Sequence, residues 1–246
     1  MENRQINYDA IAATYAQTRA AAPWVVDFLQ QHITRLPAGA TVMELGCGTG
    51  NHIRALAERL PHYHYAGFDQ SAAMLAQARA RTNAVQFSQG DAQEQWPYAD
   101  HAVDLVYNVD VIHYIQDLNT FFSEAKRVLK PGGSLLIVTD STEDLHNRSL
   151  TRFFPEILEY ELARYPAAQA LHEAAQHAGL HYLGSEAVQG TRPIDDAYIA
   201  NLAAKCSSAL RLISAEAHQA GLERVRQAQQ QGQPWHSHYT IHDYTN

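Results

Sequence analysis

The middle of the chain alternates short apolar runs with longer stretches whose apolar residues recur at helical spacing. The apolar runs predict five buried strands: Thr41–Leu45, Tyr63–Asp69, Val85–Gln89, Val103–Asn108 and Ser134–Thr139. Between them, helical spacing predicts helices over His52–Leu60, Ala72–Arg81 and Leu118–Leu129. Strands that alternate with helices predict a parallel sheet that is covered on both faces and wound right-handed.

The pattern changes on both sides of this region. Residues 1–36 predict a helical N-terminal segment, in which Pro23 suits a first helical turn. Pro131-Gly132-Gly133 predicts a turn that ends a helix and leads into the fifth strand. Beyond Thr139 we expect helices over Glu156–Tyr165 and Ala167–Ala178, a strand over Leu180–Val188, a long helical region over Ala197–Gln231 and a terminal strand over His236–Tyr244.

Composition narrows the class of protein. The 246 residues, 46% of them hydrophobic, suit one large domain, and no long uncharged apolar run predicts a membrane span. The polar N-terminus lacks the apolar core of a signal peptide, and two cysteines are too few for a disulfide framework. We therefore expect a cytoplasmic protein. The net charge of -8 and the lack of a Lys/Arg cluster disfavour nucleic acid and fit a small-molecule substrate.

The segment Glu44-Leu45-Gly46-Cys47-Gly48-Thr49-Gly50 carries the most chemical information. A hydrophobic strand runs into three glycines at alternate positions, and a helix opens directly afterwards. Glycine allows a sharp turn and lets the backbone approach a ligand without a Cβ in the way. A dinucleotide-binding loop would place its third glycine one position later, where Asn51 stands, and Glu44 is also foreign to that pattern.

This segment resembles the first motif of class I S-adenosylmethionine (SAM)-dependent methyltransferases, E/D-x-G-x-G-x-G. The resemblance implies a Rossmann-like α/β fold: a seven-stranded, mostly parallel sheet with helices on both faces, an antiparallel final strand and a helical substrate cap. It implies SAM as the cofactor. It further implies that Gly46, Cys47 and Gly48 contact the methionine part of SAM through main-chain atoms, and that Glu44 acts near its amino group.

Further residues stand where that family places its cofactor contacts. Asp69 ends the second predicted strand, where a carboxylate can accept both ribose hydroxyls. The resemblance implies that Met74 lies against adenine and that the acid of Gly90-Asp91-Ala92 accepts from the adenine amino group. Strand four ends where an open α/β sheet places its ligand crevice. The cofactor contacts predicted on this side are Asp69, Gln70, Met74, Asp91, Ala92 and Asn108.

The N-terminal segment Tyr8–Tyr15 resembles the part of small-molecule methyltransferases that folds over bound SAM. Tyr8 and Tyr15 would shield the sulfonium, and Arg19 would lie near the SAM carboxylate. The alternative is that both tyrosines simply pack against the domain.

After strand four, His113 is the candidate catalytic residue, either as a general base or as a residue that only orients the substrate.

Substrate selection is predicted to lie in two helical insertions of one domain, residues 141–165 and 197–231, around a SAM-binding core at 40–140. Phe153, Phe154, Tyr160 and Tyr165 are candidates for an aromatic lining, unless they form a core of their own. Candidate polar contacts are His146, Arg148, Arg152 and Arg164, with Arg192 and Tyr198 as further candidates. The stripe of His236, His238 and His242 lacks a completing ligand, so we expect an exposed strand face and no metal site.

The predicted function is transfer of the SAM methyl group to an N, O or C atom of a small metabolite, without nucleic-acid or membrane partners. Three alternatives stay open. The chain could act on RNA or protein, bind SAM without transferring its methyl group, or be a nucleotide-dependent oxidoreductase, against which Asn51 argues. Neither the acceptor atom nor the oligomeric state can be read from the sequence.

Overall fold

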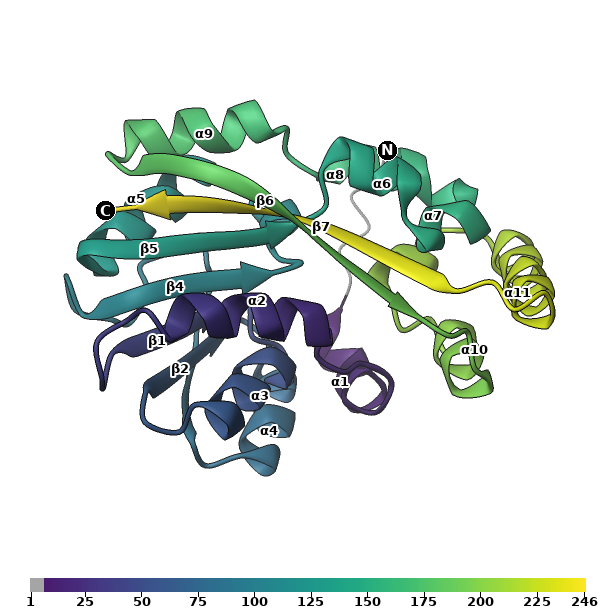
Figure 1. Cartoon of the computed structure of the whole chain (residues 1–246), viewed down its shortest axis with the longest axis horizontal. Helices are drawn as coiled ribbons and strands as arrows, with labels where there is room; N and C mark the ends of the chain where they lie inside the picture. Colours follow the sequence, from purple (N-terminus) through teal and green to yellow (C-terminus); the bar gives the residue numbers. More distant parts are fainter. Residues whose placement is uncertain (1–6) are drawn as a thin grey trace.

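The computed structural model describes residues 7–246. Its strands form one sheet in the order β3-β2-β1-β4-β5-β7-β6. Strands β1 to β5 pair in parallel, and β7 runs antiparallel to both β5 and β6. The seven-stranded, mostly parallel sheet is therefore confirmed (Figure 1). The strands are β1 (Thr41–Leu45), β2 (His64–Asp69), β3 (Val85–Gln89), β4 (Val103–Val109), β5 (Leu129–Thr139), β6 (His181–Arg192) and β7 (Trp235–Thr245).

The helices cover both faces of the sheet. On one face α5 and α9 pack over a core that includes Phe121, Leu171 and Tyr244, and on the other α2 and α3 pack over Val42 and Tyr107 (Figure 1). The α-helices are α1 (Tyr8–Thr18), α2 (Pro23–Ile33), α3 (Asn51–Arg59), α4 (Ala72–Arg81), α5 (Leu118–Val128), α6 (Thr142–Asn147), α7 (Ser149–Phe153), α8 (Leu158–Arg164), α9 (Ala168–His177), α10 (Asp196–Ala203) and α11 (Ala215–Gln230). Short 3-10 helices occupy Ile112–Tyr114, Pro155–Ile157 and Ser208–Arg211.

Several predicted boundaries are wrong, each for a local backbone reason. The helical region 1–36 lies outside the described residues over 1–6 and then divides into α1 and α2, because Arg19 and Ala22 adopt extended conformations before Pro23. The turn predicted at Pro131–Gly133 lies inside β5, since Gly132 and Gly133 pair with Asn246. The region 197–231 breaks between α10 and α11, where Lys205 is left-handed at φ 54°.

The segments after β5 and between β6 and β7 share a third core, which lies beyond the carboxyl ends of the parallel strands. We call these segments, residues 141–165 and 193–231, the cap segments; they lie at the right of Figure 1. Phe154 is fully buried there, and its ring fills the space that a Cβ at Gly221 would need. Phe153 and Trp235 stack in the same core at 5.7 Å. Residues far apart in the sequence are thus held together over one edge of the sheet.

Within residues 7–246, no helix is both long enough and apolar enough to cross a membrane.

Candidate functional site

The glycine loop after β1 is held in a conformation that needs glycine. Gly46, Gly48 and Gly50 have φ angles of 68°, 53° and 73°, in the left-handed region that disfavours other residues. A Cβ at Gly46 would clash with the side chain of Val111, whereas a Cβ at Gly48 would meet no atom within 4 Å. Gly46 therefore permits tight internal packing, and Gly48 presents bare backbone toward open space.

Asp69, at the end of β2, is tied to this loop. Gly48 donates its N–H to Oδ2 of Asp69 at 2.7 Å, and Ser71 donates its N–H to Oδ1 at 2.9 Å. Burial raises the pKa of the carboxyl above its usual value, and the two N–H donors oppose that rise. Each oxygen keeps a second lone pair, so the fixed carboxylate can still accept hydroxyl donors from a ligand.

Glu44 lies inside the domain rather than at its surface. It is 2% exposed, and Oε2 accepts the N–H of Ile53 at 3.0 Å and the hydroxyl of Tyr107 at 3.3 Å. Oε1 lies 3.7 Å from Nδ1 of His52, whose Nε2 accepts the N–H of Ala22. Burial raises the pKa of Glu44 to about 8 and lowers the pKa of His52 to about 4. Glu44 therefore joins β1 to the first turn of α3.

Other predicted cofactor contacts lie along the neighbouring strand ends. Asp91 accepts the N–H of Gln93 at 2.9 Å and is half-buried, as is Ala92. Gln70 is exposed, and Met74, only 2% exposed, begins the buried side of α4. Their contacts with SAM remain predictions.

Asn108, near the carboxyl end of β4, is fully buried. Neither its amide nitrogen nor its amide oxygen has a hydrogen-bond partner within residues 7–246. Because a buried amide is costly to leave unpaired, the Asn108 side chain is suited to pair with a polar ligand. This amide, the open backbone at Gly48 and the fixed carboxylate of Asp69 fit a polar cofactor such as SAM.

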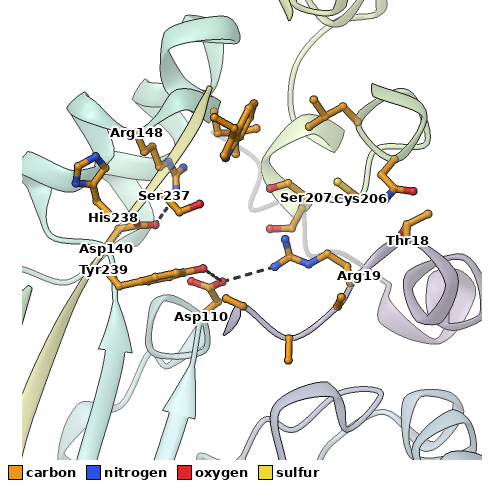
Figure 2. Close-up of a pocket in the computed structure, with 18 of the residues that line it drawn as sticks. Thr18, Arg19, Asp110, Asp140, Arg148, Cys206, Ser207, Ser237, His238 and Tyr239 are labelled. Carbon is orange, nitrogen blue, oxygen red and sulfur yellow. Dashed lines mark hydrogen bonds and ion pairs between the residues drawn. The ribbon is translucent and has the colours of Figure 1, made fainter. Parts of the chain in front are cut away.

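A cavity of about 600 Å³ lies between α1, the ends of β4 and β5, and the cap segments (Figure 2). It brings together eight residues that were predicted from distant parts of the sequence: Tyr8, Tyr15, Arg19, His113, Arg148, Tyr165, Arg192 and Tyr198. The glycine loop, Asp69 and Asp91 are not part of its lining.

Asp110, just beyond β4, lines this cavity. Its carboxylate accepts the hydroxyl of Tyr239 at 3.0 Å and lies 3.6 Å from the guanidinium of Arg19, which reaches it from the end of α1 (Figure 2). Burial raises the pKa of Asp110, and Arg19 opposes that rise. Asp110 is also left-handed, at φ 57°, a strained conformation for a residue with a Cβ.

A second charged cluster joins β5 to the first cap segment. Arg148 is paired with both Asp140 and Glu161, and Arg164 is also paired with Glu161. Burial raises the pKa of Asp140 to about 7 against the effect of Arg148. Asp140 and Glu161 were not predicted from the sequence as site residues. Asp140 directly follows β5, and Asp69 is the last residue of β2, so an acid at a strand end is the signal that could have found Asp140.

His113 lies in the cavity wall and is 9% exposed. Its ring stacks on Tyr165 at 4.4 Å, and neither ring nitrogen has a hydrogen-bond partner within residues 7–246. Burial, followed by the charges of Arg164 and Arg148, lowers the pKa of His113 well below its usual value. The imidazole is therefore neutral near pH 7 and offers one donor and one acceptor to a ligand.

Helix α1 closes one side of the cavity through contacts at its N-terminal end. The hydroxyl of Tyr8 hydrogen-bonds that of Tyr114 at 2.6 Å, and Tyr114 donates to Ser208 in the second cap segment at 3.0 Å. The carboxylate of Asp9 accepts the hydroxyl of Ser71 at 2.5 Å. These contacts place α1 over α4 and beside the cap, where a lid would lie.

Several other side-chain predictions are wrong. Phe153 and Phe154 belong to the cap core instead of lining the site, because the two cap segments bury them between each other. Tyr160 is 41% exposed, and His146 and Arg152 are also exposed and outside the cavity lining. Arg164 lies behind the cavity wall, with its guanidinium 5.5 Å from the Tyr114 ring.

The C-terminal histidines do not form an exposed strand face. His242 is 4% exposed because β7 is covered by α9 on that face, and burial lowers its pKa to about 4. His236 and His238 line the cavity, where β7 extends past the end of β5 and pairs with β6 alone. Within residues 7–246, no three side chains of His, Cys, Asp or Glu are grouped so that they could hold a metal ion.

The glycine loop and the strands around it match a known sequence family. The family described as "Methyltransferase domain" matches residues 43–137, from β1 into β5. Residues 43–137 are thus similar to the methyltransferase family, which supports a class I SAM-dependent methyltransferase. SAM is the cofactor of the family, and several solved relatives contain S-adenosylhomocysteine or sinefungin in its place. Solved structures also share the fold: one from Anabaena variabilis, named as a methyltransferase of an antibiotic biosynthesis pathway, covers 94% of this chain and 99% of its own, with a TM-score of 0.70 and 22% identity.

Similar curated sequences are named for small-molecule substrates or carrier-bound acids. Trans-aconitate 2-methyltransferase of Azoarcus sp. is 35% identical over 150 residues, which cover 60% of this chain and 58% of the relative. Malonyl-[acyl-carrier protein] O-methyltransferase of Erwinia billingiae is 33% identical over 145 residues, covering 58% and 55%. The chain thus spans a little over half the length of these relatives.

Proposed function

We propose that this chain transfers the methyl group of SAM to a nucleophilic atom of a small molecule held in the cavity. One observation carries the proposal: a glycine loop with open backbone at Gly48 leads into α3, whose His52 lines a cavity of about 600 Å³ that is closed by α1 and the cap segments. That volume is within the range of small-molecule sites. We propose that the two cap segments and the core at residues 40–140 form one domain.

In this assignment the cofactor lies across the carboxyl ends of β1, β2 and β4. The backbone of Gly46, Cys47 and Gly48 holds the methionine part, with Glu44 near the amino group and the unpaired amide of Asn108 available to it. Asp69 accepts the ribose hydroxyls next to Gln70. Adenine lies between Met74 and the Asp91-Ala92 turn. The fixed geometry of Asp69 and the unpaired Asn108 support this assignment.

Arg19 is the proposed partner of the SAM carboxylate. It lines the cavity near Tyr15, with its guanidinium carbon 5.6 Å from the ring centroid, and its present ion pair with Asp110 is long at 3.6 Å. Because this ion pair is long, Arg19 can exchange Asp110 for the carboxylate of a ligand at little cost. Tyr8 and Tyr15 shield the sulfonium in this proposal, since an aromatic face attracts a cation. The cofactor supplies an activated methyl group, so the protein mainly has to position the acceptor and exclude water.

His113 is the proposed contact to the acceptor. Its lowered pKa makes it a weak base, and its two unpaired ring nitrogens suit a role in orienting the acceptor. Among N, O and C, the relatives named for trans-aconitate and for a malonyl group favour oxygen, because both compounds are carboxylic acids.

Calorimetry with SAM and S-adenosylhomocysteine tests the cofactor assignment on wild type, Asp69→Ala and the control Asp100→Ala, whose side chain is 70% exposed. We expect Asp69→Ala to weaken binding roughly ten- to a hundredfold, as the loss of a charge-assisted hydrogen-bond pair does, and Asp100→Ala to bind as wild type. No binding by wild type would refute the proposal. Turnover of radiolabelled SAM with a metabolite panel then separates a methyltransferase from a protein that only binds SAM.

A further inference from the structure

Arg192 is the last residue of β6 and lines the cavity from the side of the second cap segment. Its guanidinium carbon lies 3.5 Å from the centroid of the Tyr198 ring. The Tyr198 ring in turn meets Trp235 edge-on at 4.7 Å, and Trp235 is buried in the cap core. Stacking on a supported aromatic ring fixes the plane of the guanidinium and leaves its N–H groups free to donate.

Charge pairing sets Arg192 apart from the other arginines at the cavity. Arg19 faces Asp110, Arg148 is paired with Asp140 and Glu161, and Arg164 shares Glu161. These three arginines and three carboxylates compensate one another. Within residues 7–246, Arg192 forms no ion pair. Of the three arginines in the cavity lining, Arg192 is therefore the one without a facing carboxylate in the described part of the chain.

Polar groups that suit an anion flank this arginine. The hydroxyl of Thr191 lies 3.2 Å from Nδ1 of His236, and both residues line the cavity. That contact uses only one ring nitrogen of His236 and leaves the other to a ligand. The hydroxyls of Ser207 and Ser208 belong to the same lining.

We propose that Arg192 is the specificity residue of the acceptor site and binds an oxyanion group, a carboxylate or a phosphate, of a small acceptor molecule. This inference rests on the proposed function, because it assigns the acceptor part of the same cavity. Arginine presents two parallel N–H groups that match the two oxygens of such a group, which fixes the orientation of the acceptor as well as its position.

The charge of the cofactor strengthens the preference for an anion. The carboxylate and the amino group of SAM compensate each other, and its sulfonium leaves one net positive charge. A cationic acceptor would face this charge together with that of Arg192. An anionic acceptor would instead be attracted by both charges.

Calorimetry with defined anions tests the role of Arg192, on the free protein and on protein saturated with S-adenosylhomocysteine. Trans-aconitate is the carboxylate probe, with its trimethyl ester as the neutral match. Phosphoethanolamine is the phosphate probe, matched by ethanolamine. The variants are Arg192→Gln, Arg192→Lys and the control Arg152→Gln. Arg152 also lies near an aromatic ring, 5.5 Å from that of Phe153, but it is outside the cavity lining.

We expect at least one anionic probe to bind wild type and Arg152→Gln alike, and its match without the anionic group not to bind. Arg192→Gln should weaken that binding roughly ten- to a hundredfold, and Arg192→Lys should give an intermediate loss. Which probe binds distinguishes a carboxylate from a phosphate acceptor. Binding of neither anion, or equal binding by Arg192→Gln and wild type, overturns the proposal. Failure of S-adenosylhomocysteine to bind would refute the proposed function, and the titrations of the free protein would still decide the role of Arg192.

Discussion

The substitution Glu44→Gln should remove a pH dependence from the stability of the fold. Burial favours the protonated form of Glu44 in the folded chain, with a pKa of about 8 against a usual 4.5. Its stabilising effect is therefore fully present below pH 4.5 and is lost as the pH rises through 8. At about 1.4 kcal/mol per pH unit, that interval corresponds to about 5 kcal/mol. A glutamine stays neutral throughout, and its carbonyl can still accept from Ile53 and Tyr107.

Urea unfolding between pH 5 and 9, followed by tryptophan fluorescence, measures this effect on wild type, Glu44→Gln and Glu223→Gln. Glu223 is exposed on α11, so its substitution changes the net charge by the same amount without a buried contact. The free energy of unfolding of Glu44→Gln should rise relative to both other proteins by several kcal/mol across this range. Asp140, with a pKa of about 7, contributes equally to all three. A difference that stays constant with pH would show that Glu44 is ionised throughout, and would refute the reasoning.

Four further outcomes are expected. Gly46→Ala should destabilise the fold more than Gly48→Ala, because only the first substitution creates a clash. Gly48→Ala should mainly weaken the binding of S-adenosylhomocysteine. Thermal unfolding and calorimetry compare the two variants, and an equal loss of stability would contradict the loop assignment. Phe154→Ala should cost about 3–5 kcal/mol in urea unfolding, since its ring is fully buried in the cap core, and a loss below 1 kcal/mol would argue against that core. Removing residues 1–20 should severely weaken cofactor binding, and an unchanged affinity would exclude the lid role of α1. His113→Ala should lower turnover at saturating acceptor, and an unchanged turnover would exclude a role of His113 in the reaction.

Much of the fold could be predicted because local pattern and global structure agree in the core of the domain. Strands β1 and β3 and helix α4 have the predicted bounds, since each apolar run ends in a residue type that stops or caps the element. Ser71, for example, caps α4 by accepting the N–H of Met74. The glycine loop could also be predicted from the sequence, because its φ angles restrict the residue type at each position.

The substrate side could not be predicted in the same way. Phe153 and Phe154 carry the same aromatic signal as Tyr165, yet the first two are buried in the cap core and the third lines the cavity. Helical spacing says which residues share a face, but not whether that face meets another helix or a ligand. Here the partner face comes from α10 and α11, which lie some forty residues or more further along the chain.

The sequence by itself determined the strand and helix pattern, the glycine loop and the acid at the end of β2, because each depends on residues close together in the chain. Only the tertiary structure decided which charges compensate one another. Arg19 meets Asp110 because the end of α1 lies against the end of β4, and Glu161 meets Arg148 because α8 packs against α6. Within residues 7–246, Arg192 meets no carboxylate at the end of β6. Coulomb interactions act over distance in space, so no local pattern records them.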